Sequence, residues 1–256
     1  MPIDIRSGVY YEVHGRGIPL FLGFPIFASY AEIFGVQQGK SVRDAFLERL
    51  TDRYRVLLID YPSIGGSETI APTDLTAERV CSDHLAVADA AGFGRFAYWG
   101  YTFGAATGLQ LATRTDRLTA LVVGGWTPLG GPYLEMARGA RVHIGNPPAP
   151  SRVVLRNPGQ YAQWATFWDS LRDWPEATEI PKIRCPRLAF AGSDADTEAG
   201  GVPIRYASTL AARRSELESL GWSVVLFEQQ SHGVGLDAVR IVPAVRKFLD
   251  AALVET

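Results

Sequence analysis

The sequence predicts an α/β fold: a mostly parallel central sheet with helices on both faces. Short runs rich in β-branched and aromatic residues alternate with longer segments of helical periodicity, which is typical of parallel strands joined by crossover helices. The 256 residues are 47% hydrophobic and 20% charged, values that are ordinary for a globular chain and sufficient for a sizeable core. We therefore expect one large folded domain and exclude a disordered or fibrous chain.

The pattern assigns seven strands and five helices in chain order. The expected strands are residues 9–13, 19–23, 54–60, 95–100, 118–125, 186–192 and 222–228. The expected helices are residues 41–50, 74–91, 106–114, 206–220 and 237–253. Within the first helix, Val42, Ala45, Phe46 and Leu50 recur at helical spacing and predict one apolar face. Gly92 is expected to end the second helix.

The strand–helix alternation stops between residues 127 and 183. This stretch holds eight of the 16 prolines and a loop-like segment, GNPPAPS, so it indicates an insertion into the regular pattern. The predicted organisation is a core domain built from residues 1–126 and 184–256, with a short lid or cap at 127–183.

Charge and composition exclude several classes of partner. Lys plus Arg is 25 and Asp plus Glu is 27, giving a formal net charge of −2, and no basic run is present, so neither nucleic acid nor an anionic membrane is an expected partner. No apolar stretch approaches the roughly 18 to 20 residues that span a bilayer, and the start lacks the features of a signal peptide. We expect a cytoplasmic protein whose partner is a small molecule; the sequence leaves its oligomeric state open.

Neither a metal nor a cofactor is predicted. Cys81 and Cys185 lie far apart and belong to no ligand spacing, so they are expected to be buried free thiols. No phosphate loop or dinucleotide-binding glycine motif occurs.

The strongest motif is Gly100-Tyr101-Thr102-Phe103-Gly104, between an apolar strand and an Ala-rich helix. It has the spacing of a nucleophile elbow, although an ordinary Gly-rich turn from strand to helix can have the same sequence pattern. Asp194 and Asp196 follow the strand at 186–192, and His232 follows the strand at 222–228. The order hydroxyl, carboxylate, histidine at strand ends is the order that a Ser…Asp…His site on this topology requires.

Four stretches carry a resemblance to one family. They are PLFLGFP at 19–25, DYPSIGGS at 60–67, WGYTFGAATGLQLA at 99–112 and SHG at 231–233. Together they resemble the α/β-hydrolase superfamily over nearly the whole chain. The chain departs from the family pattern at Leu22, where the family usually has His, at Ser63, where it has Gly, and at Thr102, where it has Ser, Cys or Asp.

The resemblance implies a role for each site residue. His232 would be the general base, and Asp194 or Asp196 would orient it, although the family's usual acid position is Ala195 here; the other aspartate would be an Asx-turn or helix-cap residue. Backbone N–H groups of Phe24 and Phe103 would form the oxyanion hole.

Thr102 would be either the nucleophile or a hydrogen-bonding hydroxyl. Its methyl group stiffens χ1 and crowds the carbon at which a tetrahedral intermediate would form.

The remaining histidines and the aromatic residues have less specific signals. His14, His84 and His143 are expected in surface or local hydrogen-bonding roles. An apolar or aromatic substrate would be bound by pocket residues Tyr101, Trp126, Trp164 and Trp168, although such aromatic stripes also arise from core packing.

The first functional hypothesis is a cofactor-independent hydrolase acting on a small apolar ester, lactone, thioester or related carbonyl compound through Thr102, His232 and an aspartate. The second is a non-hydrolytic lyase, isomerase or cyclase in which His232 moves a proton and the oxyanion hole holds an enolate or alkoxide. The third is a non-catalytic ligand-binding protein that keeps the fold, motivated by the missing Ser and the missing oxyanion-loop His.

Overall fold

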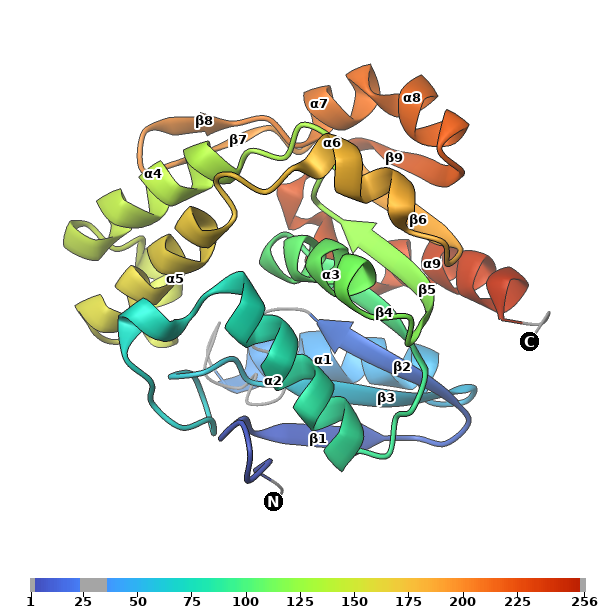
Figure 1. The fold of residues 1–256 in the computed structure, drawn as a ribbon, viewed down its shortest axis with the longest axis horizontal. Coiled ribbons are helices and arrows are strands. Elements are labelled where there is room, and N and C mark those ends of the chain that lie inside the picture. Colours follow the sequence, from blue (N-terminus) through green and yellow to red (C-terminus); the bar gives the residue numbers. More distant parts are fainter. Residues whose placement is uncertain (1–2, 24–35, 254–256) are drawn as a thin grey trace.

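A computed structural model describes residues 3–23 and 36–253, and it confirms the α/β fold with a mostly parallel sheet (Figure 1). The seven-stranded sheet has the order β1-β3-β2-β4-β5-β6-β9. Its strands are β1 (Tyr11–His14), β2 (Ile18–Gly23), β3 (Tyr54–Ile59), β4 (Phe96–Tyr101), β5 (Leu118–Gly124), β6 (Arg187–Asp194) and β9 (Trp222–Ser231). Only β1 is antiparallel to its neighbour, and the other strands run parallel. The carboxyl ends of these six strands therefore meet at one edge of the sheet.

Helices cover both faces of the sheet (Figure 1). One face carries α1 (Val36–Leu50) and α9 (Ala238–Ala252), which contact each other; the other carries α2 (Ala77–Ala90) and α3 (Phe103–Arg114). The Thr76 side chain accepts the N–H of Arg79 and caps the start of α2. The chain leaves α2 through Gly92, whose φ of +71° is the left-handed conformation that ends many helices.

The central strands read as continuous apolar runs because they are buried on both sides. All six residues of β4 are buried, as are the first nine residues of α3. The burial of α3 on most of its circumference places it between the sheet and a further layer, which the helices after β5 supply.

Five helical elements lie between β5 and β6. They are α4 (Tyr133–Gly145), η3 (Ala149–Val153), α5 (Pro158–Ser170), α6 (Glu176–Glu179) and η4 (Ile180–Lys182). A capping box starts α5, because the side chains of Asn157 and Gln160 each bond the backbone N–H of the other.

Three side chains of α5 join it to the core. Gln163 Nε2 donates to the carbonyl of Pro62 at 3.0 Å, and Gln160 Nε2 donates to the carbonyl of Ser63 at 2.5 Å. The hydroxyl of Ser170 accepts the N–H of Ala77 at the start of α2 at 2.9 Å. The helix is thus attached to the loop after β3 and to α2, and it also packs against η2 (Pro72–Asp74).

The region after β6 differs from the sequence prediction. The predicted helix at 206–220 is two short helices, α7 (Ala207–Ala212) and α8 (Arg214–Ser219). A small hairpin of β7 (Thr197–Ala199) and β8 (Val202–Ile204) precedes them and was not predicted. Strands of three residues are too short to show the alternation that identifies a strand in a sequence.

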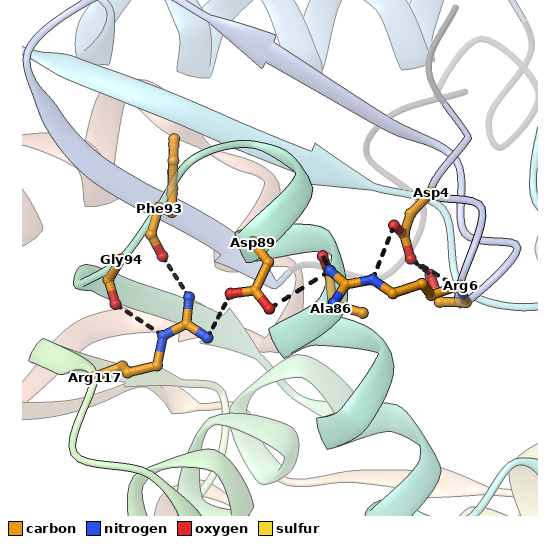
Figure 2. A network of polar contacts seen from close by, with 8 residues as sticks. Asp4, Arg6, Ala86, Asp89, Phe93, Gly94 and Arg117 are labelled. Carbon is orange, nitrogen blue, oxygen red and sulfur yellow. Dashed lines mark hydrogen bonds and ion pairs between the residues drawn. The ribbon is translucent and has the colours of Figure 1, made fainter.

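A polar network joins the N-terminal segment to the amino ends of β4 and β5 (Figure 2). The guanidinium of Arg117 donates to the carbonyls of Phe93 at 2.6 Å and Gly94 at 2.8 Å, and it pairs with Asp89 at 2.9 Å. Arg6 contacts the same Asp89 at 3.5 Å. The network holds the loops at the edge of the sheet opposite the strand ends that carry the predicted site.

The two cysteines are free. Burial raises the pKa of the Cys81 thiol to about 12 and that of the Cys185 thiol to about 11, so both are protonated at neutral pH. Across residues 3–23 and 36–253, no group of three His, Cys, Asp or Glu side chains is arranged to hold a metal ion. Within the same residues, no helix combines the length and apolar character needed to cross a membrane.

Candidate active site

The site begins at the sharp turn between β4 and α3. Thr102 lies in that turn with φ 48° and ψ −104°, a conformation that L-residues with a branched side chain rarely adopt. The turn is tight because a Cβ on Gly100 would lie 2.1 Å from the carbonyl oxygen of Gly104. Glycine at position 100 is therefore required by the close approach of strand and helix.

The same turn brings the Thr102 hydroxyl to a histidine. Thr102 Oγ1 lies 2.7 Å from Nε2 of His232, the first residue of η5 (His232–Leu236) after β9. The two residues are 130 positions apart in the chain and meet because β4 and β9 end at the same edge of the sheet. A hydroxyl and an imidazole at this distance are in reach for proton transfer.

His232 is held as a neutral imidazole. Burial lowers its pKa to about 4, so the ring is uncharged at pH 7. The residue as a whole is half-buried, but its Nδ1 is fully buried and has no hydrogen-bond partner among the described residues. When Nε2 accepts the Thr102 proton, Nδ1 must carry the other proton, and that N–H then has no acceptor.

The structure brings neither predicted aspartate to His232, which corrects the expectation that one of them orients the ring. Asp194 is exposed and accepts the hydroxyl of Ser193 at 2.9 Å. Asp196 accepts the N–H groups of Ala207 and Ser208 at 2.8 and 3.1 Å and so caps the start of α7.

A shift in strand register is one physical reason for this difference. The pairing of β6 with β9 shifts between Gly192 and Asp194, so the carboxylates leave the position that a simple residue count predicts. Ala195, at the family's usual acid position, is fully buried and carries no carboxylate.

Two tyrosine rings contact the His232 imidazole. The Tyr101 hydroxyl donates to the His232 carbonyl at 2.6 Å, and the ring centroids are 5.1 Å apart. Tyr206, just before α7, stacks on the imidazole at 4.4 Å with an interplanar angle of 18°. Sequence reasoning missed Tyr206, because a single tyrosine in a helix-like stretch gives no signal of contact with a histidine 26 residues further on.

Tyr101 occupies a slot that glycines make possible. A Cβ on Gly124, Gly125 or Gly235 would lie within 2.6 Å of the Tyr101 ring. Tyr101 is therefore fixed in place by packing as well as by its hydroxyl, and it is almost fully buried.

The predicted pocket aromatics gather beside the turn. Phe103 packs against Trp164 at 4.4 Å and against Trp168 at 5.8 Å, both on α5. Trp126 stacks on Trp168 at 5.1 Å. Trp126 and Trp168 are fully buried against each other, as in a packed core, whereas Trp164 remains partly exposed.

The structure describes one of the two predicted oxyanion donors, the backbone N–H of Phe103. Phe103 is the first residue of α3, and backbone N–H groups in the first turn of a helix lack an intrahelical acceptor. Its N–H is thus available at the residue next to Thr102. Phe24 lies outside the described residues.

None of the other three histidines contacts Thr102 or His232 in the described residues, although His84 contacts Tyr61, which packs against Phe103. His84 is fully buried, which corrects any surface role for it, while its Nδ1 makes the local bond to the Val80 carbonyl at 2.8 Å. His14 bonds to Glu12 at 2.8 Å, and His143 lies on α4.

Comparisons with known proteins show what the chain is similar to. A family model described as alpha/beta hydrolase fold matches residues 35–129. A Caulobacter vibrioides protein named as a candidate carbamate hydrolase, RutD, is 29% identical over 164 residues, which are 62% of this chain and 57% of that protein. The match thus spans little more than half the length of the curated relative.

Solved structures match over almost the whole chain. The enol-lactonase from Burkholderia xenovorans LB400 superimposes with a TM-score of 0.67 and 19% identity, covering 94% of this chain and 96% of the enzyme. A carboxylesterase structure from Nitrososphaera gargenis has a TM-score of 0.71 and 15% identity, covering 97% and 96%. At these identities the likeness establishes the fold. Together with the family model, which matches part of the chain, it shows that the chain has the α/β-hydrolase fold and is similar to proteins of that superfamily.

Proposed function

We propose that the chain is a cofactor-independent hydrolase of small apolar esters, lactones or related carbonyl compounds. The observation that carries the proposal is the 2.7 Å contact between Thr102 Oγ1 and His232 Nε2 at a strained strand-to-helix turn. Strain at a non-glycine residue in such a turn is typical of a nucleophile elbow. The names of the relatives, which include a candidate carbamate hydrolase and a lactonase, support hydrolysis as the reaction class.

The proposed reaction starts with the Thr102 hydroxyl. Its oxygen attacks the substrate carbonyl carbon while its proton passes to Nε2 of His232, and the N–H of Phe103 stabilises the resulting oxyanion. The imidazolium then gives the proton to the leaving group, which departs and leaves an acyl-threonine. Water activated by the same nitrogen releases the acid and restores the hydroxyl.

The surroundings favour an uncharged substrate. Six aromatic side chains contact the rings of His232 and Phe103: Tyr61, Tyr101, Trp164, Phe167, Trp168 and Tyr206. We propose that α4 and α5 in the segment 127–183 act as the lid that covers this site. Desolvation by such walls disfavours a charged ligand.

Ester turnover tests the proposal. A panel of short p-nitrophenyl esters is assayed with the wild type, Thr102→Ala, Thr102→Ser and His232→Ala, with Thr113→Ala and His14→Ala as matched controls away from the site. We expect a burst followed by steady turnover in the wild type and both controls, and loss of turnover in Thr102→Ala and His232→Ala. Full activity of Thr102→Ala would show that Thr102 is not the nucleophile, and full activity of His232→Ala would show that His232 is not the base.

One observation favours a second function, a non-hydrolytic lyase, isomerase or cyclase. Thr102 carries a methyl group on Cβ, which crowds the carbonyl carbon that a Thr102 nucleophile would attack. A reaction in which His232 moves a proton between substrate atoms, with Thr102 only donating a hydrogen bond, needs no such attack. Thr102→Ser would then leave turnover unimproved, whereas His232→Ala would abolish it.

A further inference from the structure

Among the described residues, no carboxylate bonds to Nδ1 of His232 as the aspartate of a Ser-His-Asp site does. A base that is free to rotate about χ2 spends part of its time with Nε2 turned away from the hydroxyl, and misorientation lowers the rate. Some other group must therefore keep the imidazole plane facing Thr102.

Tyr206 has the geometry for that task. Its ring is stacked on the imidazole at 4.4 Å with only 18° between the planes, so rotation of His232 would drive the imidazole into the tyrosine. Tyr206 is itself fixed: it is 2% exposed, and its hydroxyl contacts Sδ of Met136 on α4 at 3.1 Å.

Asp196 fixes the chain next to this tyrosine. Its carboxylate accepts the N–H groups of Ala207 and Ser208, the two residues that directly follow Tyr206. Asp196, in the loop after β6, thus holds the backbone directly after Tyr206, the residue whose ring stacks on His232.

We propose that Tyr206 is the positioning residue for His232, replacing the carboxylate of a triad, and that Asp196 supports it by capping α7. The proposal rests on the proposed function only in taking His232 as the base. Stacking fixes the ring plane but supplies no negative charge, so it orients the base without increasing its affinity for a proton.

The described groups that face His232 are all uncharged at neutral pH. They are Thr102 and Tyr101 at the end of β4 and Tyr206 before α7. Asp194, at the end of β6 beside β9, is exposed and bonded to Ser193. Burial sets the proton affinity of the imidazole, so removing the Tyr206 ring and admitting water should raise the pKa of His232 towards its ordinary value near 6.5.

The first experiment measures the imidazole directly and needs no substrate. The full chain, labelled with ¹⁵N-histidine, is titrated by NMR in the wild type, Tyr206→Phe and Tyr206→Leu, and His232→Gln assigns the resonance. The titration midpoint reports burial, whereas the ¹⁵N shifts of the neutral ring show which nitrogen carries the proton. We expect the proton on Nδ1 in the wild type and in Tyr206→Phe, and a mixture of the two tautomers in Tyr206→Leu, whose ring is no longer held with Nε2 towards Thr102. A folded Tyr206→Leu protein with the wild-type tautomer would overturn the proposal.

The second experiment separates support by Asp196 from a direct catalytic role. Asn accepts backbone N–H groups as well as Asp does but carries no charge. We therefore expect Asp196→Asn to keep wild-type turnover within about two-fold and Asp196→Ala to lower kcat with little change in KM. A drop of roughly 10⁴-fold in Asp196→Asn would identify Asp196 as a triad acid and overturn the proposal.

Stability and failure of the proposed function are controlled separately. Tyr161→Leu removes a similarly buried tyrosine ring on α5 and is expected to leave the His232 tautomer unchanged. If the wild type hydrolyses no ester but Tyr206→Leu still gives mixed tautomers, the proposed function fails and the positioning by Tyr206 stands. The same mixture in Tyr161→Leu would show a general loss of packing and overturn the assignment.

Discussion

Replacing Thr102 by glycine and by alanine measures the strain stored at the active-site turn. Both variants lose the side-chain bond to His232, so the difference between them isolates the backbone. At φ 48° and ψ −104°, a residue with a Cβ costs about 1 to 3 kcal/mol relative to glycine. Against this, glycine lowers the free energy of unfolding by roughly 0.4 to 1 kcal/mol relative to alanine, because it gives the unfolded chain more conformational freedom.

The two terms predict that Thr102→Gly is more stable than Thr102→Ala by about 1 kcal/mol, which is about 2 to 4 °C in Tm for a chain of this size. Urea unfolding followed by circular dichroism gives the free energy of unfolding of each variant, and equal m-values ensure that the comparison concerns the folded state. Greater stability of Thr102→Ala would show that the turn holds no strain and would refute the reasoning. Thr102→Ser, which keeps the hydroxyl and loses the methyl group, is the matched control.

Three further predictions concern stability. Arg117→Ala should lower the free energy of unfolding by about 2 kcal/mol, because the hydrogen bonds of its charged guanidinium are partly buried. Arg6→Ala should lower it by less than about 1 kcal/mol, because the Arg6 side chain is 60% exposed. Equal urea midpoints for the two variants would contradict this prediction. Burial lowers the pKa of His84 to about 3, so the unfolded state binds more protons between pH 3 and about 6.5, and stability should fall by about 1.4 kcal/mol per pH unit as the pH falls through that range. In His84→Phe this contribution to the slope of stability against pH should vanish, and an unchanged slope would assign the proton uptake to another group. Gly100→Ala should cost more than about 3 kcal/mol because its Cβ meets backbone, while Gly94→Ala, with open space, should stay within about 0.5 kcal/mol in the same urea series.

The sequence predicted the fold and the central pair of the site because both depend on strong local patterns. The glycines around Thr102 report a close backbone approach, and His232 follows a long apolar strand, so the parallel topology alone brings the two together. The α/β-hydrolase fold is confirmed, and each of the seven predicted strands has a counterpart in the central sheet.

The sequence could not show that neither aspartate bonds to His232, because their positions depend on a local register shift between β6 and β9. Spacing along the chain placed Asp194 and Asp196 near His232, but one remains in solvent and the other caps a helix. Tyr206 was missed for the opposite reason, since its contact with His232 exists only in the folded chain. The burial of His84 likewise follows from how α2 packs on the sheet.

The way α5 is attached bears on how the specificity of this protein could change. Gln160 and Gln163 bond to main-chain carbonyls of the loop after β3, and substitutions in that loop do not remove a carbonyl. Trp164, which contacts Phe103 and is partly exposed, makes none of these hydrogen bonds, unlike Phe167 and Trp168, which are buried in the core. Position 164 can therefore vary with the least effect on how α5 is held, which makes it the first position to randomise in a directed-evolution experiment aimed at new substrates.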